Sequence, residues 1–130
     1  VNGERVAWGP ARGDLTRWRY ETLDLAPWLR EGRNVVAALV WNFGPLAPLA
    51  QISAETGFLL QGEGEAEGVV DTGPAWKGVR NEAYAGIPVS AEEVRGYYAA
   101  GPGERLEAAR YPWGWERPTG TPARGRSSSA

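Results

Sequence analysis

Three glutamates at alternate positions come closest to a catalytic or metal-binding group in this sequence. Glu63, Glu65 and Glu67 alternate with small residues in the glycine-rich run 62–68. Paired carboxylates can act as acid and base in glycoside hydrolysis, and clustered hard oxygens suit calcium. A glycine-rich turn, however, offers nothing to desolvate a general acid and raise its pKa. We therefore favour a solvated turn, with a calcium site as the alternative, and expect no other cofactor.

A second pair of acids follows a serine further along the chain. The spacing of Ser90, Glu92 and Glu93 predicts a capping box at the start of a helical turn, where acids also suit the helix dipole. The side chains that most often act as general base or nucleophile are missing, because the chain has no His and no Cys. This excludes Ser-His-Asp chemistry, a thiol nucleophile and disulfides. We expect the chain not to be an enzyme by itself.

Two tryptophans are the best candidates for ligand binding. Trp113 and Trp115 flank Gly114, so in an extended segment both side chains would point the same way. Flat aromatic faces stack on the apolar faces of sugar rings, and the pair would then form a carbohydrate-binding platform. The alternative is that both rings pack on their own domain or on a neighbouring one.

A basic stretch near the N-terminus offers a second, weaker possibility. Arg12, Arg17 and Arg19 could bind a carboxylated sugar, although a solvated strand face explains them as well. Asp14 could contact sugar from a loop, but after Gly13 it is more ordinary as a turn residue.

Charge and hydropathy exclude two classes of partner. The formal net charge is −2, and only the last stretch is basic, so nothing indicates a nucleic-acid-binding surface. No apolar run approaches the length of a membrane span, and no signal peptide is recognisable. The chain begins at Val1 rather than Met, which leaves localisation open.

Short strand-like segments, separated by Gly and Pro, must position these groups. The expected strands are Glu4–Trp8, Arg17–Leu25, Val35–Trp41, 51–54 and 57–61. A helical turn is expected at 27–31, begun by Pro27 and ended by Gly32. This pattern predicts an all-β sandwich or barrel. Its core is expected to include Trp18, Trp28 and Trp41.

The two ends of the chain lead to expectations about its boundaries. Asn2-Gly3 is typical of a type I′ hairpin turn, yet only Val1 precedes it, so we expect a further strand before Val1. Residues 119–130 are Pro, Gly, Ser and Arg with almost nothing to bury, which indicates a linker or a disordered tail. The predicted domain is therefore 1–118.

The order of these pieces resembles the N-terminal β-sandwich domain of bacterial alpha-L-rhamnosidases. The matching segments are 1–6, 20–29, 32–37 and 111–116, with 57–61 as further support. The resemblance implies a galactose-binding-like jelly roll that lacks its first strand or strands here. After Glu116 the family usually continues with an acidic segment and another Trp, whereas this chain has Arg117-Pro118-Thr119-Gly120 and a basic tail.

The same resemblance implies a role. The family's catalytic residues lie in a separate (α/α)-barrel domain, and no position of this chain matches them. We therefore expect a non-catalytic accessory domain that positions the catalytic domain of the same polypeptide and contacts a rhamnose-containing glycan. The alternative is an independent carbohydrate-binding module that uses exposed Trp113 and Trp115. Exposed, coplanar rings would favour the module, and buried rings would favour the accessory role.

Overall fold

The computed structural model describes residues 1–11, 13–47, 55–90, 92–93 and 102–118. Within these ranges the regular elements are short, and none is an α-helix. They are the 3₁₀ helices η1 (Ala26–Trp28), η2 (Gly44–Leu46), η3 (Ala66–Val70) and η4 (Ala108–Arg110), and the strands β1 (Tyr84–Ile87) and β2 (Gly103–Leu106). No helix in the described ranges has the length and apolar character needed to span a bilayer.

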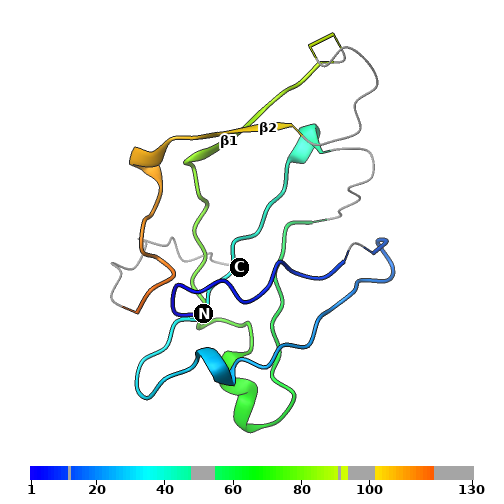
Figure 1. Cartoon of the computed structure of the whole chain (residues 1–130). Coiled ribbons are helices and arrows are strands. Elements are labelled where there is room, and N and C mark those ends of the chain that lie inside the picture. Colours follow the sequence, from blue (N-terminus) through cyan, green and yellow to red (C-terminus); the bar gives the residue numbers. More distant parts are fainter. Residues whose placement is uncertain (12, 48–54, 91, 94–101, 119–130) are drawn as a thin grey trace.

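The two strands form an antiparallel pair, with irregular chain running away from them (Figure 1). The register pairs Tyr84 with Leu106 and Ile87 with Gly103. One more backbone bond, from Glu107 N–H to the Ala83 carbonyl at 2.8 Å, extends the pairing toward η4. On one side, Leu46 of η2 approaches so closely that a Cβ at Gly86 would lie 2.8 Å from its Cδ1. Gly86 therefore lies close to the end of the Leu46 side chain.

The predicted Asn-Gly turn is present at the N-terminus. Asn2 has φ +54° and Gly3 has φ +88°, as a type I′ turn requires at both central positions. The turn is closed in both directions between Val1 and Glu4. Glu4 N–H donates to the Val1 carbonyl at 2.9 Å, and the Val1 amino group donates to the Glu4 carbonyl at 2.7 Å.

The Asn2 side chain ties this turn to the segment that follows η1. Its Nδ2 donates to the Trp28 carbonyl at 2.9 Å and to Asn34 Oδ1 at 2.8 Å, while its Oδ1 accepts from Val35 N–H at 2.9 Å. Asn34 in turn bonds both backbone groups of Arg30, at 3.0 and 2.8 Å. We call these two side chains and their partners the Asn2–Asn34 network. It fixes a contact between segments about thirty residues apart in sequence.

The short helical turn after Asp24 is also present, at 26–28 rather than 27–31. Asp24 Oδ1 accepts from Ala26 N–H at 2.9 Å, and Pro27 occupies the first turn, where its missing N–H costs nothing. The turn ends at Trp28 with Leu29 extended, so Gly32, at φ +83°, does not end it as predicted but lies in the loop that follows.

The predicted strands 4–8, 17–25, 35–41 and 57–61 are corrected by the structure. None of them forms a strand, and 51–54 lies outside the described residues. A strand exists only through the ladder that it shares with another strand, and these segments find no such ladder in the described part of the chain. The described chain is nevertheless mostly non-helical, with no α-helix and a two-stranded antiparallel sheet, which is consistent with the predicted all-β class.

The prediction that three tryptophans form the core is also wrong, because no second layer covers them in the described chain. Trp18 is 65% exposed, Trp41 43% and Trp28 39%. Of the described hydrophobic residues, only Val1 and Ala83 are buried. Alternating sequence patterns create an apolar face, but a facing layer is needed to bury it. The predicted tail at 119–130 lies outside the described residues.

We predict that this chain by itself unfolds without a sharp cooperative transition. With so little apolar surface buried, both the free energy of unfolding and its heat-capacity increment should be small. Calorimetry should give a heat-capacity increment well below the ~12–15 cal/mol/K per residue of ordinary domains. A dye that reports exposed apolar surface should bind already in buffer. A sharp two-state transition with an ordinary increment would contradict the prediction.

A second prediction separates the two roles of Asn2. Asn2→Gly removes the side-chain bonds but tolerates positive φ, whereas Asn2→Ala also adds backbone strain of about 1–2 kcal/mol. Exchange of the Glu4 amide, which closes the turn, should therefore be roughly tenfold faster in the Ala variant than in the Gly variant. Asn42→Ala is the control, because Asn42 bonds Thr56 and Gly44 instead. Equal exchange in both Asn2 variants would show that the left-handed conformation is not required.

Candidate functional site

A continuous row of aromatic side chains lies beside the two-stranded sheet. Ring centroids are 5.8 Å apart for Phe43 and Trp41, 5.1 Å for Trp41 and Tyr84, 6.0 Å for Tyr84 and Tyr111, and 4.6 Å for Tyr111 and Trp113. We call these five residues the ring array. Its interplanar angles run from 56° to 81°, the tilted and edge-to-face range that aromatic pairs prefer.

Trp113, one of the two residues predicted from sequence, is the open end of this array. Its side chain is 67% exposed, yet it is held at two points. Its Nε1 donates to the Ala108 carbonyl of η4 at 2.9 Å, and its ring lies against Tyr111. The indole is therefore oriented in advance while it still offers surface to solvent, as a stacking surface requires.

Trp115, the other predicted residue, is placed differently. It is half-buried, and its Nε1 donates to the Tyr111 hydroxyl at 3.2 Å. The segment is not extended as expected, because Gly114 has φ +80° and Trp115 N–H bonds back to the Pro112 carbonyl at 3.3 Å. A turn replaces the alternation that would have set both rings side by side. The two tryptophans instead meet Tyr111, one at its ring and one at its hydroxyl.

Tyr84 lies at the middle of the array, on the first residue of β1. Partial burial raises the pKa of its phenol, with smaller contributions from the charges of Tyr111 and Glu104. Burial opposes formation of the phenolate, so Tyr84 stays neutral and its ring remains apolar throughout the physiological range.

The three glutamates of 62–68 lie in a solvated turn, as favoured from sequence. Glu63, Glu65 and Glu67 are all exposed, the last within η3. Asp71 closes the loop, since its Oδ1 accepts from Gly62 N–H at 2.8 Å. Among the residues that the structure describes, no group of three or more acidic side chains is arranged to hold a metal ion.

The capping box at Ser90 has the predicted geometry. Ser90 N–H donates to Glu93 Oε2 at 2.7 Å, and Glu93 N–H donates to Ser90 Oγ at 3.2 Å. These bonds from Ser90 lower the pKa of the Glu93 carboxyl. Glu92 is exposed, and the helical turn expected after it lies outside the described residues.

The candidates near the N-terminus form a turn. Asp14 Oδ1 accepts from the hydroxyl and the N–H of Thr16, at 2.7 and 2.8 Å, and these bonds lower the pKa of Asp14. Gly13 precedes it, and a Cβ there would overlap the Arg17 carbonyl. Asp14 is thus a turn residue, as expected. Arg17 and Arg19 are exposed, and Arg12 lies outside the described residues.

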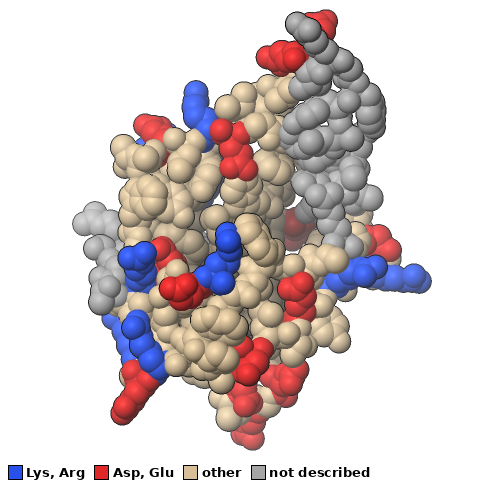
Figure 2. Space-filling view, viewed as in Figure 1, with Lys and Arg blue, Asp and Glu red and all other residues tan. Residues whose placement is uncertain are grey.

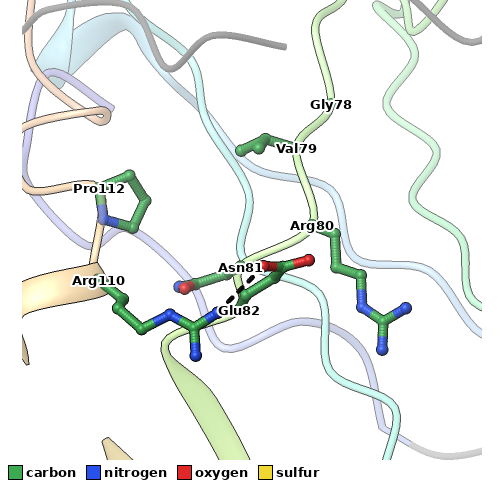
Figure 3. A pocket seen from close by; sticks show the side chains of 7 residues that line it. All are labelled: Gly78, Val79, Arg80, Asn81, Glu82, Arg110 and Pro112. Carbon is green, nitrogen blue, oxygen red and sulfur yellow. Dashed lines mark hydrogen bonds and ion pairs between the residues drawn. The ribbon is translucent and has the colours of Figure 1, made fainter. Parts of the chain in front are cut away.

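A hollow lined by both polar and apolar groups lies beside the ring array and was not predicted from sequence. Its volume is about 570 Å³, and it is lined by Gly78, Val79, Arg80, Asn81, Glu82, Arg110 and Pro112. Figure 3 shows Arg110 reaching Glu82 from the opposite segment, an ion pair of 3.2 Å. Residues 82 and 110 directly precede the buried Ala83 and the ring of Tyr111, so the hollow and the array share two segments of chain.

Surface charge agrees with the low net charge. On the face drawn in Figure 2, acidic and basic side chains are interspersed around a broad area without charge.

No family model, curated protein or solved structure was found to match this chain.

We predict that Tyr111→Phe releases Trp115 without disturbing Trp113. The variant keeps the ring of residue 111 but removes the hydroxyl that accepts from the Trp115 indole. A hydrogen bond of about 1 kcal/mol net corresponds to roughly fivefold faster exchange of the Trp115 indole N–H. The Trp113 indole N–H, bound to Ala108, is the internal control. Unchanged exchange at Trp115 would show that this bond contributes nothing.

Proposed function

We propose that this chain is an accessory domain of an alpha-L-rhamnosidase-like glycoside hydrolase. In this role it positions the catalytic domain of the same polypeptide and makes a weak contact with a rhamnose-containing glycan. Hydrolysis is left to the catalytic domain, because this chain has no His or Cys and its clustered glutamates lie exposed in a turn.

Two local features support the family part of the proposal. The Asn2-Gly3 turn and the Pro27 turn belong to the segments that resemble the rhamnosidase β-sandwich, and both have the expected backbone conformation. The sandwich itself is part of the proposal. It would supply the ladders and the facing layer that would cover Trp18 and Trp28.

The observation that carries the carbohydrate contact is the state of Trp113. An indole that is 67% exposed, and yet fixed by a hydrogen bond and a ring contact, gives up little conformational entropy when a sugar stacks on it. Single exposed tryptophans are otherwise free to rotate.

The rival function, an independent carbohydrate-binding module, requires more than one ring. Two coplanar tryptophans would give a platform with affinity of its own, but Trp115 is half-buried and its indole N–H is engaged by Tyr111. A small polar ligand on one ring gains little beyond the cost of association. The accessory role is therefore the better match to this geometry.

We predict binding of free L-rhamnose no tighter than about millimolar. Saturation-transfer NMR should detect the contact, and Trp113→Ala should abolish it. Trp8→Ala is the matched control, since Trp8 is 85% exposed but lies outside the ring array, next to Arg5. Micromolar affinity would favour the binding module. No contact at high sugar concentration, or equal loss in both variants, would contradict carbohydrate binding at Trp113.

A further inference from the structure

The hollow beside the ring array combines groups of three kinds. Val79 and Pro112 supply apolar surface, Asn81 and Glu82 supply uncharged and anionic hydrogen-bonding groups, and two arginines supply cations (Figure 3). Convergent polar groups beside apolar surface are typical of sites for small polar ligands. The charge of such a ligand depends on which of the two arginines lacks a carboxylate partner.

The charge of Arg110 is already balanced. Its guanidinium bonds Glu82 Oε2 at 3.2 Å and Glu107 Oε2 at 3.4 Å, the second from outside the hollow. Arg110 thus lies between two carboxylates. A ligand anion would gain little there, because it would compete with both.

Arg80 differs, because it has no carboxylate within ion-pair distance among the described residues. Figure 3 shows its guanidinium on the other side of Glu82 from Arg110. A planar guanidinium without a partner can take a carboxylate through two parallel N–H···O bonds. The unbalanced positive charge of the hollow therefore lies at Arg80.

The two residues that follow Arg80, Asn81 and Glu82, each have a hydrogen-bonding group without a partner in the described part of the chain. Asn81 Oδ1 accepts from Ala83 N–H at 3.1 Å, which leaves the two donors of its Nδ2 without a partner in the described part of the chain. Glu82 engages Arg110 through Oε2, so its Oε1 can accept a hydroxyl. Together these groups match the alternating donors and acceptors of sugar hydroxyls.

We propose that this hollow binds a carboxylate-bearing sugar, with the carboxylate on Arg80 and ring hydroxyls on Asn81 and Glu82. The inference rests on the proposed function, because it names the class of sugar that an accessory carbohydrate contact would take here. It adds a site distinct from Trp113, which does not line the hollow. A uronic acid is the simplest ligand of this class.

The test compares three probes on the whole chain by amide NMR titration. D-galacturonate carries both features, D-galactose has the same ring without the carboxylate, and acetate has the carboxylate without the ring. Galacturonate should shift the amides of Gly78 to Glu82 and bind about two- to fivefold tighter than galactose, the size expected of an exposed ion pair. The preference should fall as salt is added.

Variants separate this site from the aromatic contact. Arg80→Gln should abolish the preference for galacturonate, Arg80→Lys should retain part of it, and Lys77→Gln should leave it unchanged. Lys77 is the matched control because it is a nearby exposed cation outside the hollow. Equal binding of galacturonate and galactose, or equal effects of Arg80→Gln and Lys77→Gln, would overturn the proposal.

The remaining outcomes tell the two proposals apart. Acetate binding as tightly as galacturonate would show a carboxylate site without sugar recognition and would also overturn the inference. If rhamnose binding is lost in Trp113→Ala while galacturonate shows no preference, the proposed function stands and the hollow does not. If Arg80 governs galacturonate binding while Trp113→Ala has no effect on rhamnose, the hollow stands and the aromatic contact fails.

Discussion

The hydrogen bonds of the Asn2 side chain hold the N-terminal turn against the segment 28–35. An asparagine tolerates the left-handed conformation better than other residues with a Cβ, and its amide can both donate and accept. Asn2 uses both properties, since it turns the chain at φ +54° and bonds Trp28, Asn34 and Val35. No glycine could make these side-chain bonds, and a serine or alanine would not offer the amide. The residue type is thus set by backbone conformation and by hydrogen bonding together.

The same turn also reaches the other end of the described chain. A Cβ at Gly3 would lie 3.1 Å from Cγ of Arg117, so the side chain that follows the aromatic segment lies against the N-terminal turn. Through this contact and Asn2, a hydrogen-bonded turn connects the segment near η1 to the one that carries Trp113. Polar contacts of this kind order the chain even though little apolar surface is buried. They join distant segments but are exposed or only partly buried, so each contributes little free energy.

The features that were predicted correctly from sequence are those whose hydrogen bonds join residues close together in the chain. The Asn2-Gly3 turn, the capping box at Ser90 and the Asp14 turn are each closed within a few residues, and each was predicted correctly. The strands at 17–25 and 35–41 were not, because a ladder needs a partner that the alternating pattern does not name. β1 and β2 were missed for the opposite reason: Gly86 and Gly103 weaken their strand pattern, and pairing alone forms them.

At the candidate site, the sequence identified the aromatic residues but not their arrangement. Trp113 and Trp115 were recognisable as aromatic side chains around a glycine, but that glycine is the reason why they do not form a platform. With Gly114 at φ +80°, the chain turns, and Tyr111 becomes the residue on which both indoles converge. Tyr111 follows η4 directly, and η4 also provides the Ala108 carbonyl that holds Trp113. A single 3₁₀ turn therefore sets the orientation of the exposed ring and, through Arg110, one wall of the hollow. Arg110 and Trp113 therefore come from one short segment, 110–113, although Trp113 does not line the hollow.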